Sequence, residues 1–381
     1  MHQVKKIKIK SFKRLHEIEI EMRPLMVMIG PNGVGKTSLL EAISLLSSSA
    51  AGKMKSTLND MGGVSNIITQ VQSDKEISLT ATMDVVRHKP LEYNLCIEPS
   101  GQTYKISSES LMQTRGQHTD PFKHIDSSHG FVHYFDTETN KLVKPNWEYD
   151  CFETALSQVP KMFKEPEELR RVLSSVIQYH ALDVSSRAPI KLPQQMKPAD
   201  FPGANGEDLV SFLYSLRESY HDCYEVIEDT LRAAFPWFES LNFPPVAAGT
   251  LSLTWKEKHF DRALYTNQLS EGILRFLWLI SLLQSPGLSM VTMIDEPEVS
   301  LHPELLSLLA KLMREASEKT QIIVATHSDR LIRFLEPKEV LIMDVDEKGF
   351  ASAKWADTLD LKGWLKDYSL DEIWGMGRLT G

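Results

Sequence analysis

The sequence predicts an α/β fold with a mainly parallel sheet, and three apolar runs indicate it. The first, at residues 25–29, leads through a glycine-rich stretch into a helical pattern. The second, at residues 290–294, ends in two carboxylates, and the third, at residues 321–325, ends at Thr326. Nearly continuous apolar runs are typical of strands buried on both faces, as in parallel sheets. The residues that follow each run are therefore the candidate site, because ligands of open α/β sheets bind at the carboxyl ends of the strands.

The glycine-rich stretch after the first run is predicted to be a phosphate-binding loop. Its spacing, Gly-x-x-x-x-Gly-Lys-Thr, lets consecutive backbone amides curl around a phosphate, because glycines accept backbone angles that a Cβ would forbid. At the start of the following helix, Lys36 is placed to reach the β- and γ-phosphates and the Thr37 hydroxyl to ligate Mg²⁺. The residues predicted to bind the nucleotide here are Gly30, Pro31, Asn32, Gly33, Val34, Gly35, Lys36, Thr37 and Ser38.

Asp295 and Glu296 end the second run and are predicted to serve the metal and the attacking water. Mg²⁺ prefers oxygen ligands, so Asp295 suits the cation. A second carboxylate one residue later faces another direction, so Glu296 can orient or deprotonate water. Taken alone, an acidic pair after a strand is more often a solvated turn.

Ser270, Glu271 and Gly272 precede an apolar helical pattern at residues 273–280. Because Ser270 is a good N-cap, the segment taken alone is typical of a capped core helix. The functional interpretation is a second anion-binding helix start. Since the first loop already holds one side of the triphosphate, this element is most useful against a γ-phosphate bound by another subunit.

His327 follows the third run, at the sheet edge where ligands are expected. A histidine there can contact a γ-phosphate oxygen or the attacking water. An isolated histidine is more often a structural residue, so this prediction depends on the other three elements.

In this order the four elements resemble the ABC-type ATPases of the RecF, structural-maintenance-of-chromosomes (SMC) and overcoming-lysogenization-defect (OLD) superfamily. The chain is similar in particular to the ATPases of the AAA_21/AAA_15 group, because residues 295–303 are close to that group's DEPExxLHP pattern. Weaker local likenesses lie at residues 183–187, 205–209 and 364–370. The resemblance implies a P-loop fold with an ABC-type head, in which a mainly parallel sheet is joined by an antiparallel β-subdomain and a compact α+β insert.

The resemblance also implies a role for each matching segment. Residues 30–38 match the Walker A loop, residues 269–272 the ABC signature, and residues 300–302 the D-loop. The Walker B aspartate corresponds to Asp295, the catalytic base to Glu296 and the switch residue to His327. The implied cofactors are ATP and Mg²⁺.

The implied assembly is a homodimer that forms head to head on ATP binding, with Ser270 completing the partner's site. The signature carries Glu271 where transporters usually have glycine, which leaves the serine contact intact. The Q-loop glutamine stays unassigned between Gln70 and Gln72.

Composition limits the class of protein. A chain of 381 residues with 42% hydrophobic content can bury a large core in two or three lobes. The formal charge of −9 argues against a dedicated nucleic-acid coat protein but leaves room for a local basic groove. Cys96, Cys151 and Cys223 show no metal spacing, which fits a reduced cytoplasmic compartment. The longest apolar stretch is too short to span a bilayer, so no membrane association is expected.

The sequence is predicted to divide into three segments, because the motifs of the nucleotide-binding core lie near its two ends and a different strand and helix pattern lies between them. Residues 1–50 form the N-terminal part of the head, residues 51–250 a β-subdomain with a helical insert, and residues 251–381 the C-terminal part of the head. The insert lacks a heptad repeat, so it is compact where chromosome-organising relatives carry a coiled coil.

Local patterns give further expectations. Residues 4–10 and 16–22 alternate as half-buried antiparallel strands, with Lys6, Lys8 and Lys10 on one face that is either solvated or, less often, in contact with nucleic acid. In the turn between them, Lys13 and Arg14 are weak nucleotide candidates. Further strands are expected at residues 76–86, 91–97 and 103–107, a hairpin at 130–143, helices at 165–179, 206–216 and 220–234, a turn after the strand at 341–346, and a terminal helix within 359–381 that buries Trp364 and Trp374.

The prediction that follows is an ABC-type ATPase acting as a motor or sensor in DNA maintenance or anti-phage defence. A separate effector protein and double-stranded DNA are the partners considered. The alternative is an ATP-dependent switch in a protein assembly that does not contact nucleic acid. A transporter subunit is disfavoured because more than 250 residues separate Lys36 from Asp295.

Overall fold

The computed structural model describes residues 3–71, 75–85, 89–114, 121–128, 130–360 and 368–376. They fall into two compact units, the first made of Met1–Ile177 with Leu341–Thr358 and the second of Gln178–Val340 with Leu359–Gly381. The division into three sequence segments at residues 50 and 250 stays a prediction.

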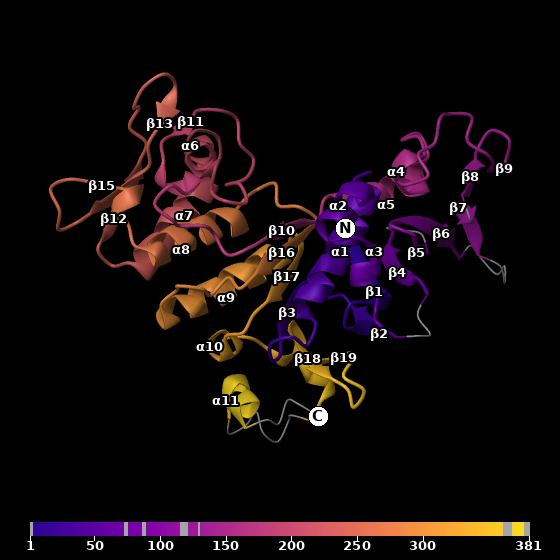
Figure 1. Ribbon diagram of the computed structural model, residues 1–381. Coiled ribbons are helices and arrows are strands. Elements are labelled where there is room, and N and C mark those ends of the chain that lie inside the picture. Colours follow the sequence, from indigo (N-terminus) through magenta and orange to yellow (C-terminus); the bar gives the residue numbers. More distant parts are fainter. Residues whose placement is uncertain are drawn as a thin grey trace. The chain divides into compact units, whose positions relative to one another are not determined.

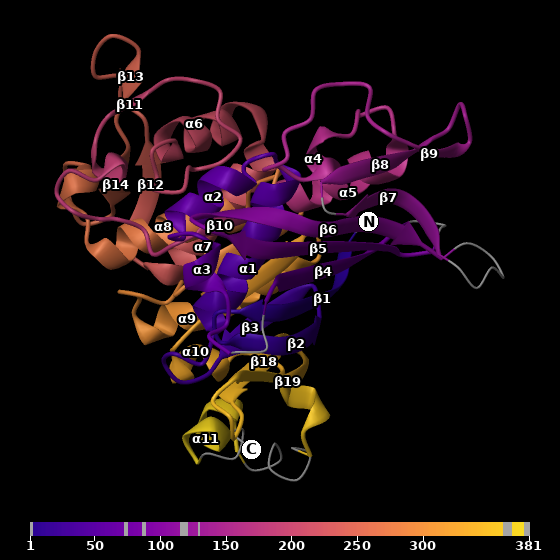
Figure 2. The same cartoon turned by 45° about the vertical axis from the view of Figure 1, so that its right-hand side comes forward.

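An eight-stranded antiparallel sheet dominates the first unit, and Figure 2 shows several of its strands side by side. The strands expected at residues 4–10, 16–22, 76–86, 91–97 and 103–107 and in the hairpin at 130–143 are confirmed, whereas β7 (Phe122–Ser128) was not predicted. On the outer face, Lys6 and Lys10 form ion pairs with Glu19 and Glu17 of β2, so this face is solvated, as expected. In sheet order the strands are β2 (Leu15–Glu21), β1 (Gln3–Phe12), β4 (Ile77–Asp84), β5 (Leu91–Ser100), β6 (Thr103–Gln113), β7 (Phe122–Ser128), β8 (Phe131–Asp136) and β9 (Lys141–Val143).

Strand β3 (Leu25–Ile29) is buried along its whole length and leads into α1 (Lys36–Ala50), as the apolar pattern predicts. Strands β3, β18 (Val340–Val345) and β19 (Ala351–Trp355) are neighbours, and β18 pairs with β19 antiparallel. The other helices of this unit are α2 (Met54–Asp60), α3 (Val64–Ile67), α4 (Ala155–Gln158) and α5 (Lys164–Ser174).

The prediction of a helix at residues 165–179 is wrong at its C-terminal end. Helix α5 stops at Ser174, and the next residues form the short strand β10 (Ile177–Tyr179). Ser175 ends the helix with its hydroxyl donating to the Val172 carbonyl at 2.8 Å. The β-branched residues that follow favour an extended chain, which the helical periodicity before them did not reveal.

The second unit contains the two other predicted buried strands, β16 (Val291–Asp295) and β17 (Gln321–Ala325), which pair parallel. Their register aligns Asp295 with Ala325, so both strands end at one edge. Helix α9 (Pro303–Ser317) connects them and contacts α8 (Glu271–Leu283) (Figure 1). The short helix α10 (Asp329–Ile332) follows β17.

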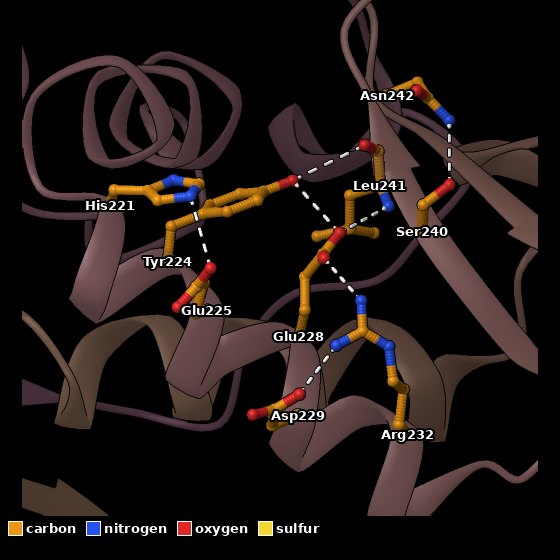
Figure 3. Close-up of polar contacts among 9 residues, drawn as sticks. All are labelled: His221, Tyr224, Glu225, Glu228, Asp229, Arg232, Ser240, Leu241 and Asn242. Atoms are coloured by element: carbon orange, nitrogen blue, oxygen red, sulfur yellow. Dashed lines mark hydrogen bonds and ion pairs between the residues drawn. The ribbon is translucent and has the colours of Figure 1, made fainter.

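A lobe of small sheets and helices completes the second unit. The helices expected at 206–216 and 220–234 are confirmed as α6 (Leu209–Ser219) and α7 (His221–Ala234). Figure 3 shows how Glu228 of α7 holds β12 (Phe238–Asn242), since its carboxylate accepts a hydrogen bond from the Leu241 amide at 3.1 Å while Arg232 donates to the same side chain. The remaining elements are η1 (Pro189–Lys191), β11 (Gln194–Gln195), β12 (Phe238–Asn242), β13 (Thr250–Leu251), β14 (Thr254–Glu257), β15 (Leu264–Tyr265), η2 (Thr266–Gln268) and η3 (Pro337–Glu339).

The C-terminal expectations are met in part. After β18, the Asp346 carboxylate accepts hydrogen bonds from the Lys348 and Phe350 amides, so this aspartate forms a turn, as expected. Beyond η4 (Ala356–Thr358), the described terminal helix is only α11 (Leu370–Gly375). Trp374 is half-buried rather than buried because a six-residue helix covers little surface, and Trp364 lies outside the described residues.

Candidate functional site

The glycine-rich loop lies between β3 and α1 of the first unit, where the sequence placed it. Two of its glycines are required by the backbone. Gly35 has φ 113° as the N-cap of α1, and a Cβ at Gly30 would lie 2.2 Å from the Met343 carbonyl oxygen. Gly33 also has a positive φ, of 79°. The loop therefore takes the curled conformation that glycine permits and other residues oppose.

The start of α1 suits an anion. No side chain caps this helix, and its first turn contains no acidic residue, so its amides and dipole favour a negative ligand. Lys36 is buried, and its Nζ atom donates to the carbonyls of Gly30 at 2.6 Å and Pro31 at 3.0 Å. The cation therefore lies within the loop. Among the other predicted residues, Pro31, Asn32, Gly33 and Thr37 are exposed, Ser38 is half-buried, and Val34 is buried as a packing residue.

Glu296 and His327 lie close together just beyond the carboxyl ends of β16 and β17 in the second unit. The His327 Nε2 atom is 3.8 Å from a Glu296 carboxylate oxygen, and both side chains are substantially exposed. Glu296 has φ 49°, in the left-handed region that side chains oppose, and its amide donates to the Ala325 carbonyl at 2.8 Å. Strained backbone of this kind persists where the surrounding structure enforces it, and it is common at active sites.

Asp295 lies at the end of β16, and its carboxylate is 3.8 Å from His180 Nδ1. His180 was missed by sequence reasoning, because nothing near it in the chain marks it. A small pocket beside this pair is lined by His180, Arg275, Trp278, Asp295 and Glu296 among others.

The segment 270–272 begins α8, as predicted. The Ser270 hydroxyl accepts a hydrogen bond from the Ile273 amide at 3.3 Å, so the serine is an N-cap. Ser270 and Glu271 are exposed, whereas Gly272 lies against the carbonyl of Ser300. Ser300 itself has φ 63°. The structure thus brings the signature-like segment and the D-loop-like segment together within one chain.

The weaker candidates have local partners. The Gln70 amide donates to the carbonyls of Ser65 and Ile68, while Gln72 lies outside the described residues. Lys13 forms an ion pair with Glu41 of α1. The Q-loop glutamine and the contribution of Lys13 and Arg14 therefore stay predictions.

The donor chemistry fits Mg²⁺ bound together with a nucleotide. Within the described part of the chain, no group of three or more His, Cys, Asp or Glu side chains is arranged to hold a metal ion. Mg²⁺ usually takes one or two protein oxygens and completes its shell with water and substrate phosphates. The Thr37 hydroxyl, exposed in the first unit, is an oxygen donor of that kind. Separately, so is the Asp295 carboxylate, 22% exposed in the second unit.

The fold, with its phosphate loop, is that of a P-loop ATPase with an ABC-type head. Residues 25–333 match the family model AAA_21, described as "AAA domain, putative AbiEii toxin, Type IV TA system". The chain belongs to this family, and it is an ATPase of the RecF, SMC and OLD-like group. The predicted class and fold are therefore confirmed.

Solved structures agree on the fold. An SMC head bound to the C-terminal winged-helix domain of ScpA has a TM-score of 0.54 at 13% identity, covering 92% of this chain and 97% of the other. An SMC head with an extended coiled coil from Pyrococcus furiosus, bound to the C-terminal domain of ScpA, also has a TM-score of 0.54, at 12% identity, covering 98% of this chain and 100% of that one.

The chain also shares a short stretch of sequence with a nuclease. It is 42% identical over 43 residues to an OLD nuclease of Thermus scotoductus, which is 11% of this chain and only 8% of that relative's length. Among the described helices, none has the length and apolarity needed to cross a membrane.

Proposed function

We propose that the protein hydrolyses MgATP, and the observation that carries this proposal is the pairing of Glu296 with His327. A carboxylate held 3.8 Å from an imidazole can take a proton from water while the ring supports the phosphate. Membership of the AAA_21 family, together with the phosphate loop, supports ATP as the nucleotide. The test is phosphate release from ATP by the purified wild-type protein, with and without Mg²⁺. No Mg²⁺-dependent release above a Lys36→Ala preparation would refute the proposal.

In this proposal the loop residues 30–38 bind the triphosphate through backbone amides, and Lys36 neutralises the β- and γ-phosphates. Thr37 and Asp295 would hold Mg²⁺, and the cation would supply positive charge against the charge that develops on the phosphates. Glu296 orients and deprotonates the attacking water, and His327 steadies the γ-phosphate.

We propose further that the active form is a head-to-head dimer in which Ser270 acts on the partner's nucleotide. Two features support this assignment. Ser270 and Glu271 are exposed at the start of a 13-residue helix, and Gly272 lies against Ser300, so two segments with assigned dimer roles are adjacent. Light scattering of the Glu296→Gln protein tests it, since ATP should convert that variant from monomer to dimer. A mass that ATP does not change would contradict the dimer.

The proposed cellular role is a motor or sensor in DNA maintenance or anti-phage defence, with the effector on a separate chain. The description of the AAA_21 family, which names a toxin of a type IV TA system, and the short match to an OLD nuclease both support this role. Stimulation of ATP hydrolysis by duplex DNA would support it directly.

A second candidate is an ATP-dependent switch in a protein assembly that never touches DNA. The specific observation in its favour is the neutralised face of β1, where Lys6 and Lys10 are paired with Glu19 and Glu17. Paired lysines on an acidic protein offer little to a phosphate backbone. An unchanged hydrolysis rate across a range of DNA concentrations at low salt would favour this candidate.

A further inference from the structure

Glu298 lies two residues beyond Glu296 and is half-buried, and it is not among the residues proposed to bind or hydrolyse ATP. Its carboxylate connects the segment after β16 to the end of β17. The Oε1 atom accepts a hydrogen bond from the Thr326 hydroxyl at 2.5 Å and a second from the His327 amide at 3.2 Å. Glu298 therefore holds the backbone from which the His327 ring projects.

Thr326 is suited to this contact. It is fully buried, and its hydroxyl oxygen also accepts a hydrogen bond from the Ser328 amide at 2.9 Å, so its proton is directed to the carboxylate of Glu298. The segment from Thr326 to Ser328 is thus organised around one hydroxyl and one carboxylate. Because the Thr326 hydroxyl donates one hydrogen bond and accepts another, the two bonds together hold the side chain in one rotamer.

A second link lies on the same two segments. The Glu296 amide donates to the Ala325 carbonyl, and this bond accompanies the left-handed backbone of Glu296. The residues 296 and 298 are therefore tied to residues 325, 326 and 327 by three hydrogen bonds. This clamp of three bonds joins the two segments that carry Glu296 and His327.

Burying the carboxylate of Glu298 costs free energy of folding. The Oε2 atom of Glu298 is buried without a hydrogen-bond partner among the described residues. Burial raises the pKa of Glu298 and the neighbouring Glu296 adds to the rise, whereas the hydrogen bonds from Thr326 and His327 oppose it. An apolar side chain of this size would avoid the cost of burying a carboxylate. Packing alone therefore does not explain why a hydrogen-bond acceptor occupies this position.

We propose that Glu298 is a positioning residue for ATP hydrolysis, which holds the end of β17 so that His327 faces Glu296. The inference rests on the proposed function and deepens it. Glu298 acts through the backbone of its neighbours and does not touch the nucleotide. Its loss should reduce turnover while leaving ATP affinity unchanged, because the phosphate loop is on other elements.

The experiment compares Glu298→Met, which keeps the length without an acceptor, with Glu298→Gln, which keeps an oxygen for both donors. We expect the methionine variant to lose about 10- to 100-fold in kcat with KM for ATP changed less than about twofold, because small misplacements of catalytic groups cost this much. The glutamine variant should stay within about threefold of wild type, since a neutral acceptor preserves both hydrogen bonds. Thr326→Val should behave like the methionine variant and Thr326→Ser like wild type.

The control is Glu315→Met, which removes an exposed carboxylate on α9 and should leave kcat unchanged. ATP hydrolysis by the wild-type protein tests the proposed function separately from the role of Glu298. If wild type does not hydrolyse ATP, the proposed function is refuted. If it does, the variants of Glu298 test the positioning role alone. A folded methionine variant with wild-type kcat would overturn the inference, and so would a glutamine variant as impaired as methionine. If Glu298→Met does not fold, the two Thr326 variants decide, and equal kcat for valine and serine overturns the inference.

Discussion

Gly272 lies so close to the carbonyl oxygen of Ser300 that a Cβ at position 272 would stand 2.8 Å from it. Gly272 is in the first turn of α8, and Ser300 has a left-handed backbone with φ 63°. Separations under 3 Å force something to move, and here the obstacle is backbone rather than a flexible side chain. The glycine of the signature-like segment is therefore required by the segment that resembles a D-loop.

The first prediction is that Gly272→Ala destabilises the protein. Alanine is the better helix former by about 1 kcal/mol, but the clash with Ser300 should outweigh this, giving a net loss of about 1–3 kcal/mol. Chemical denaturation monitored by tryptophan fluorescence measures the loss. Gly287→Ala is the matched control, because the nearest atom to its Cβ is 4.0 Å away and no change beyond about 0.5 kcal/mol is expected. A stabilised Gly272→Ala protein would show that the contact is not restrictive.

The second prediction concerns Glu296, whose carboxylate lies 3.8 Å from His327 Nε2. Glu296→Gln keeps the shape and removes the base, so ATP should still bind while hydrolysis falls by about 10²–10⁴-fold. Phosphate release and equilibrium binding of a fluorescent ATP analogue measure the two effects separately. Hydrolysis at the wild-type rate would remove Glu296 from the role of base.

The third prediction concerns Lys36, whose Nζ atom donates to the carbonyls of Gly30 and Pro31. In the Lys36→Ala variant the triphosphate loses its nearest cation, so ATP binding should weaken by at least about tenfold. The loop also loses two hydrogen bonds, which should cost about 0.5–1.5 kcal/mol each in stability. Isothermal titration with ATP, at a temperature where both proteins are folded, separates the two effects.

Lys141→Ala is the control for Lys36, because Lys141 is an exposed lysine of β9 outside the phosphate loop. It removes the same charge and should leave the affinity for ATP unchanged. Equal affinity of the Lys36→Ala and Lys141→Ala proteins would refute the assignment of the loop.

The sequence predicts what is encoded locally. Spacing and periodicity within about ten residues predict the loop 30–38, the N-cap Ser270 and the strands that end at Asp295 and Ala325. The structure contains all of these features. The end of α5 was placed wrongly because a helical pattern runs into β-branched residues without a glycine or proline between them.

The contacts that shape the candidate site were not predictable in this way. The approach of Gly272 to Ser300 joins residues 28 positions apart, and the bond from Thr326 to Glu298 does the same. The left-handed backbone of Glu296 contradicts its residue type, since only the surrounding hydrogen bonds hold it there. Sequence patterns identify the chemical groups, whereas their orientation depends on tertiary contacts.

The fourth prediction concerns Glu109 of β6, a fully buried carboxylate in the first unit. It accepts hydrogen bonds from the Tyr93 hydroxyl at 3.0 Å and from the amides of Ala155 and Leu156 at 2.6 and 2.8 Å. Burial raises the pKa of Glu109 to about 7, although these donors favour the charged form and oppose the rise. The folded protein therefore holds this proton more tightly than the unfolded chain does.

A raised pKa in the folded state contributes stability that is present below the unfolded value of 4.5 and is lost as the pH rises through about 7. We expect the stability of wild type relative to Glu109→Gln to fall by about 1–3 kcal/mol between pH 5 and pH 8, because the amide does not ionise. Urea denaturation of both proteins at the two pH values measures this difference. Glu92→Gln, on the exposed face of β5, should show no such pH dependence relative to wild type. A difference between wild type and Glu109→Gln that is the same at both pH values would mean that Glu109 stays ionised in the folded protein, held by its three donors.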